Sequence, residues 1–178
     1  MKKTIVVYQS KYGATKKYAE WLSQILKCDI IERKKCNVSL LKGYDTIVYG
    51  GGIYATGIAG ISLIKNNVAQ LSGKTIVVFA VGASPYEPKA FEEIKKKNMD
   101  GVTADIPLFY CRGAFYEGKM TVGDKIMIGM LKKMVGKKDP SQYETWEKAL
   151  MEAAGQDGDW TSEESLQPIV KYLADKTV

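Results

Sequence analysis

Short runs of β-branched and aromatic residues recur along the chain, separated by segments in which apolar residues follow a helical spacing. Runs that are apolar at nearly every position are typical of strands covered on both faces of a sheet. Five strands are expected, at Thr4–Tyr8, Asp29–Ile31, Thr46–Tyr49, Thr75–Val81 and Ile106–Cys111. The pattern therefore predicts an α/β protein built on a parallel sheet.

Apolar residues at helical spacing occupy the segments between strands. One set follows the first strand and another follows the third: Tyr18, Leu22, Ile25 and Leu26, then Ile61, Ile64, Val68 and Leu71. A last helix is expected to begin at a capping box of Thr161 and Glu164. Its apolar stripe consists of Leu166, Ile169, Val170 and Leu173. Strands that alternate with helices in this way indicate right-handed crossover connections.

Length and composition favour one domain over residues 1–178. A chain of 178 residues with 46% hydrophobic content can bury one core, and no linker divides it. The start, Met1-Lys2-Lys3, leads straight into a strand instead of a signal peptide. No apolar run reaches the roughly 20 residues of a membrane span. We therefore expect a cytoplasmic protein.

Residues that usually carry metal or nucleophilic chemistry are scarce. The chain has no histidine, and its cysteines (Cys28, Cys36 and Cys111) are odd in number and lack a CxxC spacing. Neither a zinc site nor a disulfide framework is expected, and a Ser-His-Asp or Cys-His nucleophile cannot be built. Hydrolase functions are therefore disfavoured, and all three cysteines are expected to be free thiols.

The chain is basic, with 26 lysines and arginines against 20 acidic residues and a pI near 9.0. Only Arg33 and Arg112 are arginines, and runs such as Lys95–Lys97 fit a solvated helix face. No basic strand with interleaved aromatic residues, as RNA-binding domains carry, is visible. No nucleic-acid partner is therefore expected, whereas an anionic membrane surface stays open.

A phosphate-binding turn is predicted directly after the first strand, at Ser10–Thr15. At a strand-to-helix turn the first backbone N–H groups lack intrahelical partners and the helix dipole is positive, so an oxyanion can bind there. The hydroxyls of Ser10 and Thr15 would add donors, and Gly13 would let the backbone approach the phosphate. No basic residue stands where a triphosphate would be clamped, so a single phosphate is expected. A turn without a ligand is the alternative, because such residues are common in turns.

The turn resembles the first loop of flavodoxin-like proteins, a Ser/Thr-x-Thr-Gly-x-Thr sequence around the FMN 5′-phosphate. The chain matches it at Ser10, Gly13, Ala14 and Thr15, while Tyr12 replaces the middle Thr. The resemblance implies an α/β flavodoxin-like three-layer sandwich whose five-stranded parallel sheet has the order 2-1-3-4-5. It also implies FMN as the cofactor, bound outside the carboxyl ends of the strands at the switch point of the sheet.

Two further loops are expected at the same edge, Gly50–Gly57 after the third strand and Gly82–Tyr86 after the fourth. Their glycines would let the backbone approach a flat ring, Tyr54 or Tyr86 would stack on it, and amides near Gly57 would bond the flavin N5 edge. The alternative is that the glycines only end a buried strand and both tyrosines lie on the surface. The predicted cofactor-binding residues are Ser10, Lys11, Tyr12, Gly13, Ala14, Thr15, Gly52, Ile53, Tyr54, Ala55, Thr56, Gly57, Gly82, Ala83, Ser84 and Tyr86.

A long insert, at about residues 112–160, separates the fifth strand from the last helix, where about 2 to 6 residues are typical. The segments Phe109–Phe115 and Lys119–Val135 resemble the Gly-x-Leu/Phe … Asp-Arg/Lys-x-Met … Lys-Met pattern of menaquinone-dependent protoporphyrinogen dehydrogenases, and Tyr8–Thr15 also fits that group. This resemblance implies a porphyrinogen substrate and a quinone acceptor. The insert carries fewer basic and aromatic residues than in some members, and the loop Gly50–Gly57 is unusually glycine-rich.

The insert is expected to contain a helix at Asp124–Lys138. Its apolar arc would hold Ile126, Met127, Ile128, Met130, Leu131, Met134 and Val135, with Lys125, Lys132 and Lys133 on the opposite side. Such a helix suits peripheral contact with an anionic membrane surface, and packing against the domain core is the alternative. Arg112 would pair with a carboxylate of a substrate or partner, or close a surface salt bridge. The predicted substrate or partner residues are Arg112, Phe115, Met127 and Met130.

Two functions fit these features. In the first, an FMN-dependent oxidoreductase takes hydride equivalents from a reduced substrate, with a porphyrinogen as candidate, and passes them to a quinone or another acceptor. The alternative is a non-enzymatic electron carrier of the flavodoxin type. Such carriers are typically acidic, so the net charge of +6 and the insert favour the enzyme. A response-regulator receiver would need Asp residues after the first strand, where Tyr8, Gln9 and Ser10 stand.

Overall fold

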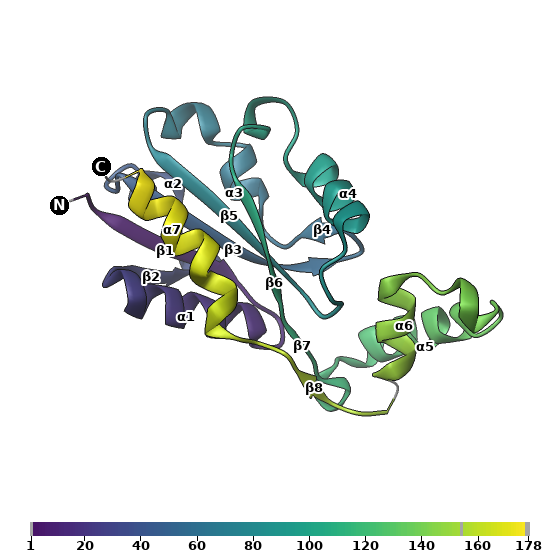
Figure 1. The fold of residues 1–178 in the computed structure, drawn as a ribbon. Coiled ribbons are helices and arrows are strands. Elements are labelled where there is room, and N and C mark those ends of the chain that lie inside the picture. Colours follow the sequence, from purple (N-terminus) through teal and green to yellow (C-terminus); the bar gives the residue numbers. More distant parts are fainter. Residues whose placement is uncertain (1, 154, 177–178) are drawn as a thin grey trace.

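The computed structural model describes residues 2–153 and 155–176. Its centre is a parallel sheet with the strands β1 (Thr4–Gln9), β2 (Asp29–Glu32), β3 (Thr46–Tyr54), β5 (Thr75–Gly82) and β6 (Leu108–Arg112). These strands follow the order β2-β1-β3-β5-β6 (Figure 1). A short strand, β4 (Gly57–Ile58), pairs with β3 in the antiparallel direction. Because β4 stands outside the parallel series, the predicted order 2-1-3-4-5 is confirmed.

Helices cover both faces of the sheet (Figure 1). On one face lie α1 (Ala14–Leu26) and α7 (Gln167–Asp175), which bury their apolar stripes against the strands. On the other face lie α2 (Val38–Leu41), α3 (Ser62–Lys65) and α4 (Pro88–Asn98). Both faces of the central strands are therefore buried, which explains their near-continuous apolar sequences. The predicted three-layer sandwich is confirmed.

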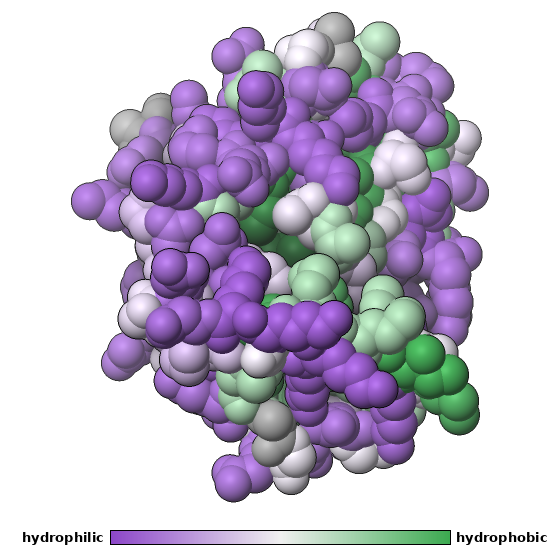
Figure 2. All heavy atoms as spheres, turned by 90° about the vertical axis from the view of Figure 1, so that its right-hand side faces the viewer, coloured by the Kyte–Doolittle hydropathy of each residue, from purple (hydrophilic) through white to green (hydrophobic). Residues whose placement is uncertain are grey.

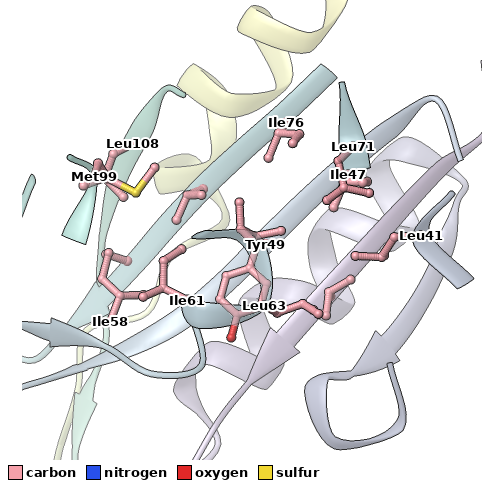
Figure 3. Close-up of a cluster of buried hydrophobic side chains, with 14 of the residues drawn as sticks. Leu41, Ile47, Tyr49, Ile58, Ile61, Leu63, Leu71, Ile76, Met99 and Leu108 are labelled. Carbon is pink, nitrogen blue, oxygen red and sulfur yellow. The ribbon is translucent and has the colours of Figure 1, made fainter. Parts of the chain in front are cut away.

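The core between the sheet and α2, α3 and α4 is shown in Figure 3. Ile47 and Tyr49 of β3 point toward side chains from the covering helices, such as Leu63 of α3. Tyr49 is fully buried, and its hydroxyl donates a hydrogen bond of 2.7 Å to the Ala59 carbonyl. Burial raises the pKa of this hydroxyl, so it stays protonated. The one polar atom of the side chain is thus satisfied inside an apolar core.

The glycines at positions 50–52 lie inside strand β3 and not in a loop that follows a shorter strand. The predicted loop is therefore wrong in its first part, because β3 continues to Tyr54 before the chain turns. A Cβ atom on Gly50 would lie 2.1 Å from Cζ of the buried Phe79 on the neighbouring strand. The absence of a side chain at Gly50 thus makes room for Phe79. The alternative, that these glycines belong to a buried strand, describes the structure better.

The helix predicted over Ile61–Leu71 is interrupted. It consists of α3 and a separate 3-10 turn at Val68–Leu71. Asn67 lies between them and donates a side-chain hydrogen bond to the Leu63 carbonyl at 2.9 Å, while its own carbonyl accepts from the Gln70 amide. Side chains of this kind compete with the helical backbone for hydrogen bonds, which favours a break.

The last helix is present, but the predicted capping box is wrong. The chain enters it through a 3-10 turn at Glu163–Leu166, capped by Ser162, whose hydroxyl accepts a hydrogen bond from the Glu164 amide at 3.2 Å. Thr161 does not cap the turn, because its hydroxyl already bonds Asp159 at 2.6 Å. The same hydroxyl also accepts a hydrogen bond from the Lys17 ammonium group of α1 at 2.7 Å, and the cap lies one residue later than predicted.

The insert forms a lobe at one side of the sandwich (Figure 1). A two-stranded antiparallel ribbon of β7 (Ala114–Phe115) and β8 (Gly158–Asp159) leads into and out of it. Helices α5 (Val122–Val135) and α6 (Thr145–Glu152) lie between the two strands and pack against each other. The remaining short 3-10 turns of the chain are at Arg33–Lys35, Gly101–Thr103, Glu117–Lys119 and Pro140–Gln142. The predicted insert helix is thus confirmed, but it spans Val122–Val135 and not Asp124–Lys138.

All three cysteines are free, as predicted. Burial raises the pKa of the Cys28 thiol, with a smaller contribution from Asp29, to about 11 and that of Cys111 to about 12. Both are therefore protonated and weakly nucleophilic at neutral pH. Over the described part of the chain, no helix is both long enough and apolar enough to cross a membrane.

Candidate functional site

The predicted phosphate turn connects the end of β1 at Gln9 to the start of α1 at Ala14. Gly13 has φ +104° and ψ −24°, a conformation that side chains rarely adopt, and its amide donates to the Ser10 hydroxyl at 3.1 Å. No side chain among the described residues caps the amides of α1, and no acidic residue lies in its first turn. Thr15 is 3% exposed. The turn therefore presents unpartnered N–H groups at a positive helix end, which is the usual arrangement for binding an oxyanion.

The turn is fixed from outside by the first turn of α5. One carboxylate oxygen of Asp124 accepts hydrogen bonds from the Tyr12 hydroxyl and from the Lys11 ammonium group, the latter at 2.5 Å. The amide of Thr121, the residue that caps α5, donates to the Tyr12 hydroxyl at 3.3 Å. The side chains of Lys11 and Tyr12 thus bind the insert. The replacement of the usual Thr by Tyr12 has a structural reason, because only a longer side chain reaches α5.

The second loop is a tight hairpin between β3 and β4. Ala55 and Thr56 form its turn with φ values of 46° and 65°. Positive φ at both positions is the geometry of a type I′ turn, which residues other than Gly, Asn and Asp adopt at a cost. Lys97 of α4 donates to the Ala55 carbonyl at 2.9 Å and to the Thr56 hydroxyl at 2.8 Å. Helix α4 therefore contributes to holding a strained turn at the edge of the site.

Asn98, the last residue of α4, supplies the main contacts to this hairpin. It is 5% exposed, and its side-chain oxygen accepts from the Ile58 amide at 2.8 Å. Its side-chain nitrogen donates to the carbonyls of Thr56 and Ile94, both at 2.7 Å. Sequence reasoning missed Asn98, because it ends a lysine-rich helix and nothing in its neighbourhood along the chain marks it.

The third loop follows β5 and is held by β6. The Tyr110 hydroxyl donates to the Ser84 carbonyl at 2.5 Å, and Nε of Arg112 donates to the Ala83 carbonyl at 3.3 Å. Burial raises the pKa of the Tyr110 hydroxyl, so it remains a donor. Tyr86 lies 5.9 Å from Tyr110, between ring centroids, and keeps 56% of its surface exposed. The loop therefore ends in an accessible aromatic ring.

The three loops lie together at the carboxyl edge of the sheet, as expected for an open parallel sheet. Gly82 of the third loop lies close to Ile53 of the second, because a Cβ atom on Gly82 would be 3.2 Å from the Ile53 side chain. The Lys11 ammonium group lies 5.8 Å from the centroid of Tyr54, which is 41% exposed, and this contact joins the first loop to the second. Burial raises the pKa of the Tyr54 hydroxyl, while the nearby Lys11 opposes the shift. Whether these residues hold a ligand stays a prediction.

The four predicted substrate or partner residues lie in different places. Arg112 stacks on Trp160, with its guanidinium carbon 4.4 Å from the ring centroid, and forms no ion pair among residues 2–153 and 155–176. Phe115 is buried in the ribbon. Met127 and Met130 lie on the exposed side of α5, with 46% and 60% of their surface accessible. Arg112 therefore contacts one of the three loops, through its hydrogen bond to the Ala83 carbonyl.

A polar network that sequence reasoning missed ties the ribbon to α1. Asp159 accepts hydrogen bonds from Thr161, from the Tyr116 hydroxyl at 2.8 Å and from the Lys17 ammonium group at 3.1 Å. Partial burial would raise the pKa of this carboxyl, but these hydrogen bonds outweigh it and hold the pKa well below its usual range. Asp159 therefore stays ionised and fixes the end of the insert beside the helix that carries the turn.

The fold and these loops define an open, doubly wound α/β protein with a loop-built site at the switch point of its sheet. The sequence profile of the flavodoxin domain matches residues 5–153. The chain belongs to the flavodoxin domain family. No curated protein sequence matches the chain.

Similar solved structures include flavodoxins. A WrbA-like flavodoxin from Agrobacterium tumefaciens is 18% identical, covers 70% of this chain and 88% of its own, and has a TM-score of 0.49. Oxidised flavodoxin 1 from Bacillus cereus is 18% identical over 61% of this chain and 84% of its own, with a TM-score of 0.41. Two-electron reduced flavodoxin from Megasphaera elsdenii is 16% identical over 60% of this chain and 84% of its own, with a TM-score of 0.44.

Proposed function

We propose that the protein binds FMN and works as an oxidoreductase that passes reducing equivalents between a reduced substrate and a quinone or another acceptor. The observation that carries this proposal is the uncapped start of α1 at Gly13, which lies at the same sheet edge as the two other loops. Membership of the flavodoxin domain family supports FMN as the ligand of that turn.

The donors at the turn fit the FMN phosphate. The amides at the start of α1 and the hydroxyls of Ser10 and Thr15 would bind a dianion without any basic side chain. The exposed rings of Tyr54 and Tyr86 would border the isoalloxazine ring, and the hairpin at Ala55–Gly57 would place backbone groups at its edge. When bound, FMN supplies the hydride and electron chemistry, and these residues position it and exclude water.

Arg112 is the residue that we assign to the substrate. Its stacking on Trp160 and its bond to the Ala83 carbonyl fix the plane of the guanidinium group, which has no carboxylate partner among the described residues. A fixed, unpaired guanidinium group suits a carboxylate. A porphyrinogen carries such groups, and the resemblance of Lys119–Val135 to the menaquinone-dependent protoporphyrinogen dehydrogenases supports this substrate with a quinone as acceptor.

The second candidate is an electron carrier that passes single electrons between proteins, as flavodoxins do. The net charge of +6 and the lobe built by the insert favour the oxidoreductase, because flavodoxin carriers are typically acidic and need no lobe beside the cofactor. Turnover separates the two. An oxidoreductase would consume protoporphyrinogen with a menaquinone analogue as the only acceptor, whereas a carrier would need a reductase and a protein acceptor.

The first test is the absorption spectrum of the protein after incubation with FMN and gel filtration. We expect retained flavin bands at about 375 and 450 nm. In Thr15→Ala we expect about tenfold weaker FMN binding with the fold retained, because one donor to a charged phosphate is lost. A colourless protein, or a Thr15→Ala variant that binds FMN as tightly as the parent, would contradict the assigned turn.

A further inference from the structure

Helix α5 carries most of the large apolar side chains that the protein exposes. Among the described residues nine such side chains are exposed, and five of them lie on this one helix. They are Val122 (75% exposed), Ile126 (59%), Met127 (46%), Met130 (60%) and Met134 (51%), referred to below as the α5 stripe. Exposed apolar side chains are usually scattered singly over a protein surface, so five of them on one helix indicate an interaction surface.

The stripe follows from the helical repeat. Val122, Ile126, Met130 and Met134 are four residues apart, so they lie above one another on one side of the helix. The opposite side holds Ile128 and Leu131, which are half-buried, and Val135, which is fully buried. The predicted single apolar arc is therefore divided into an inner half and an exposed outer half. Figure 2 shows green apolar residues interrupting a mostly purple surface on the side of the molecule that carries the lobe.

The charge around the stripe is strongly positive. Residues 119–138 contain six lysines and one acidic residue, Asp124. Asp124 is neutralised by Lys11, Lys132 is paired with Glu117 at 3.0 Å, and Lys138 is paired with Glu147 at 2.5 Å. Lys125 and Lys133 are exposed and form no ion pair within the described ranges. The apolar stripe is thus bordered by free cationic groups.

We propose that the α5 stripe docks on the surface of an anionic lipid bilayer, with the helix lying in the plane of the interface. The stripe would enter the boundary between headgroups and acyl chains, and the bordering lysines would bind anionic headgroups. The 14 residues of α5 make a helix of about 21 Å, which is shorter than the bilayer core and suits a flat position. Methionine side chains are flexible enough to fill an irregular, fluid surface.

A second copy of the chain is a poorer occupant than lipid. A symmetric dimer through the stripe would bring the lysines of one copy against the same lysines of the other, and like charges at an interface oppose association. An anionic bilayer removes this repulsion and offers both an apolar layer and a negative surface.

Docking in this way has a consequence for the candidate site. Asp124, in the first turn of α5, contacts Lys11 and Tyr12 of the phosphate turn, so the surface that meets the bilayer adjoins the cofactor loops. A lipid-soluble quinone would then reach the site from the bilayer. This consequence rests on the proposed function, whereas the docking itself does not.

The test is co-sedimentation of the full chain with vesicles of phosphatidylcholine alone or mixed with phosphatidylglycerol. We expect binding to the anionic vesicles that weakens between about 0.1 and 1 M salt, as the Debye length falls from about 10 to about 3 Å. An Ile126→Ser/Met130→Gln variant should bind at least about tenfold more weakly, because two apolar side chains no longer enter the bilayer. The matched control, Ile25→Ser/Ile30→Ser, changes two exposed isoleucines outside the lobe and should bind like the parent.

A second pair of variants tests the charge. Lys125→Gln/Lys133→Gln should reduce the preference for anionic vesicles, whereas Lys89→Gln/Lys96→Gln on the exposed side of α4 should leave it unchanged. Circular dichroism and thermal unfolding check that each variant is folded. Equal vesicle binding by the α5 variants and their controls would overturn the proposal. So would a dimer in sedimentation velocity that Met130→Gln abolishes, because the stripe would then bind a second copy. FMN retention is scored separately, so failure of docking and failure of the proposed function are distinguishable.

Discussion

Replacing Asn98 by alanine should destabilise the protein and loosen the hairpin at the candidate site. The Asn98 side chain makes three hydrogen bonds of 2.7 to 2.8 Å, to the Ile58 amide and to the carbonyls of Thr56 and Ile94. The Ile94 carbonyl keeps the possibility of a helical partner, so the alanine variant leaves two groups at the hairpin without a partner. At about 1 to 3 kcal/mol for each of the two buried groups left unpaired, we expect the free energy of unfolding to fall by about 2 to 6 kcal/mol.

Urea unfolding followed by circular dichroism measures this change. The matched control is Asn66→Ala, since Asn66 is exposed, and its effect should stay within about 0.5 kcal/mol. In the cold, where the variant remains folded, FMN should also bind more weakly because the turn at Ala55–Thr56 has lost the hydrogen bond from Asn98 to the Thr56 carbonyl. If Asn98→Ala and Asn66→Ala unfold at the same urea concentration, Asn98 does not hold the hairpin as argued.

Three further changes test other parts of the structure. Gly50→Ala should cost about 1 to 3 kcal/mol in urea unfolding, because its Cβ would lie 2.1 Å from Phe79, and a Phe79→Leu background should recover part of the loss. The Asp124→Asn variant should bind FMN about fivefold more tightly by calorimetry, because Lys11 loses its ion pair and can attract the phosphate by about 1 kcal/mol. Unchanged or weaker binding counts against this. The pKa of Asp159 is lowered in the folded protein, so the ionised carboxylate stabilises the fold above pH 3.8, its ordinary pKa, and this stabilisation is lost as the pH falls below that value. The Asp159→Asn variant should therefore show a flatter acid side in a plot of Tm against pH. An equally steep acid side in Asp159→Asn would exclude that carboxyl as the cause.

The layers of this fold were predictable because the central strands are buried on both faces, which leaves a signal in every position of the run. Val77 and Val78 are both fully buried although they point to opposite sides of β5. Edges of elements were less predictable. Strand β3 extends through three glycines. A glycine can be needed for a turn or for space beside a neighbouring side chain such as Phe79, and the sequence alone does not distinguish the two reasons.

The candidate site was predictable only where its residues are neighbours in sequence. The turn at Ser10–Thr15 has a local signature, because a strand, a glycine and a helix must follow one another. The contacts that fix the loops join distant residues instead. Tyr12 and Asp124 are 112 positions apart, and Asn98 and Thr56 are 42 apart. Such pairs depend on how the chain folds back on itself, and no local pattern of residues around either partner marks them.

The contact between Asp124 and Lys11 also decides what attracts an anion to the turn. Lys11 is the only basic residue in Ser10–Thr15, and the Asp124 carboxylate already compensates its charge. Although the chain has a net charge of +6, no unpaired basic side chain within Ser10–Thr15 attracts an anion to the turn. The attraction has to come from the unpartnered amides and the dipole of α1, which act only over the first turn of the helix. The positive charge of Lys11 can pair with the Asp124 carboxylate or with a bound phosphate, but it cannot neutralise both. The position of α5 and the affinity of the turn for an anion are therefore linked through the Lys11–Asp124 pair.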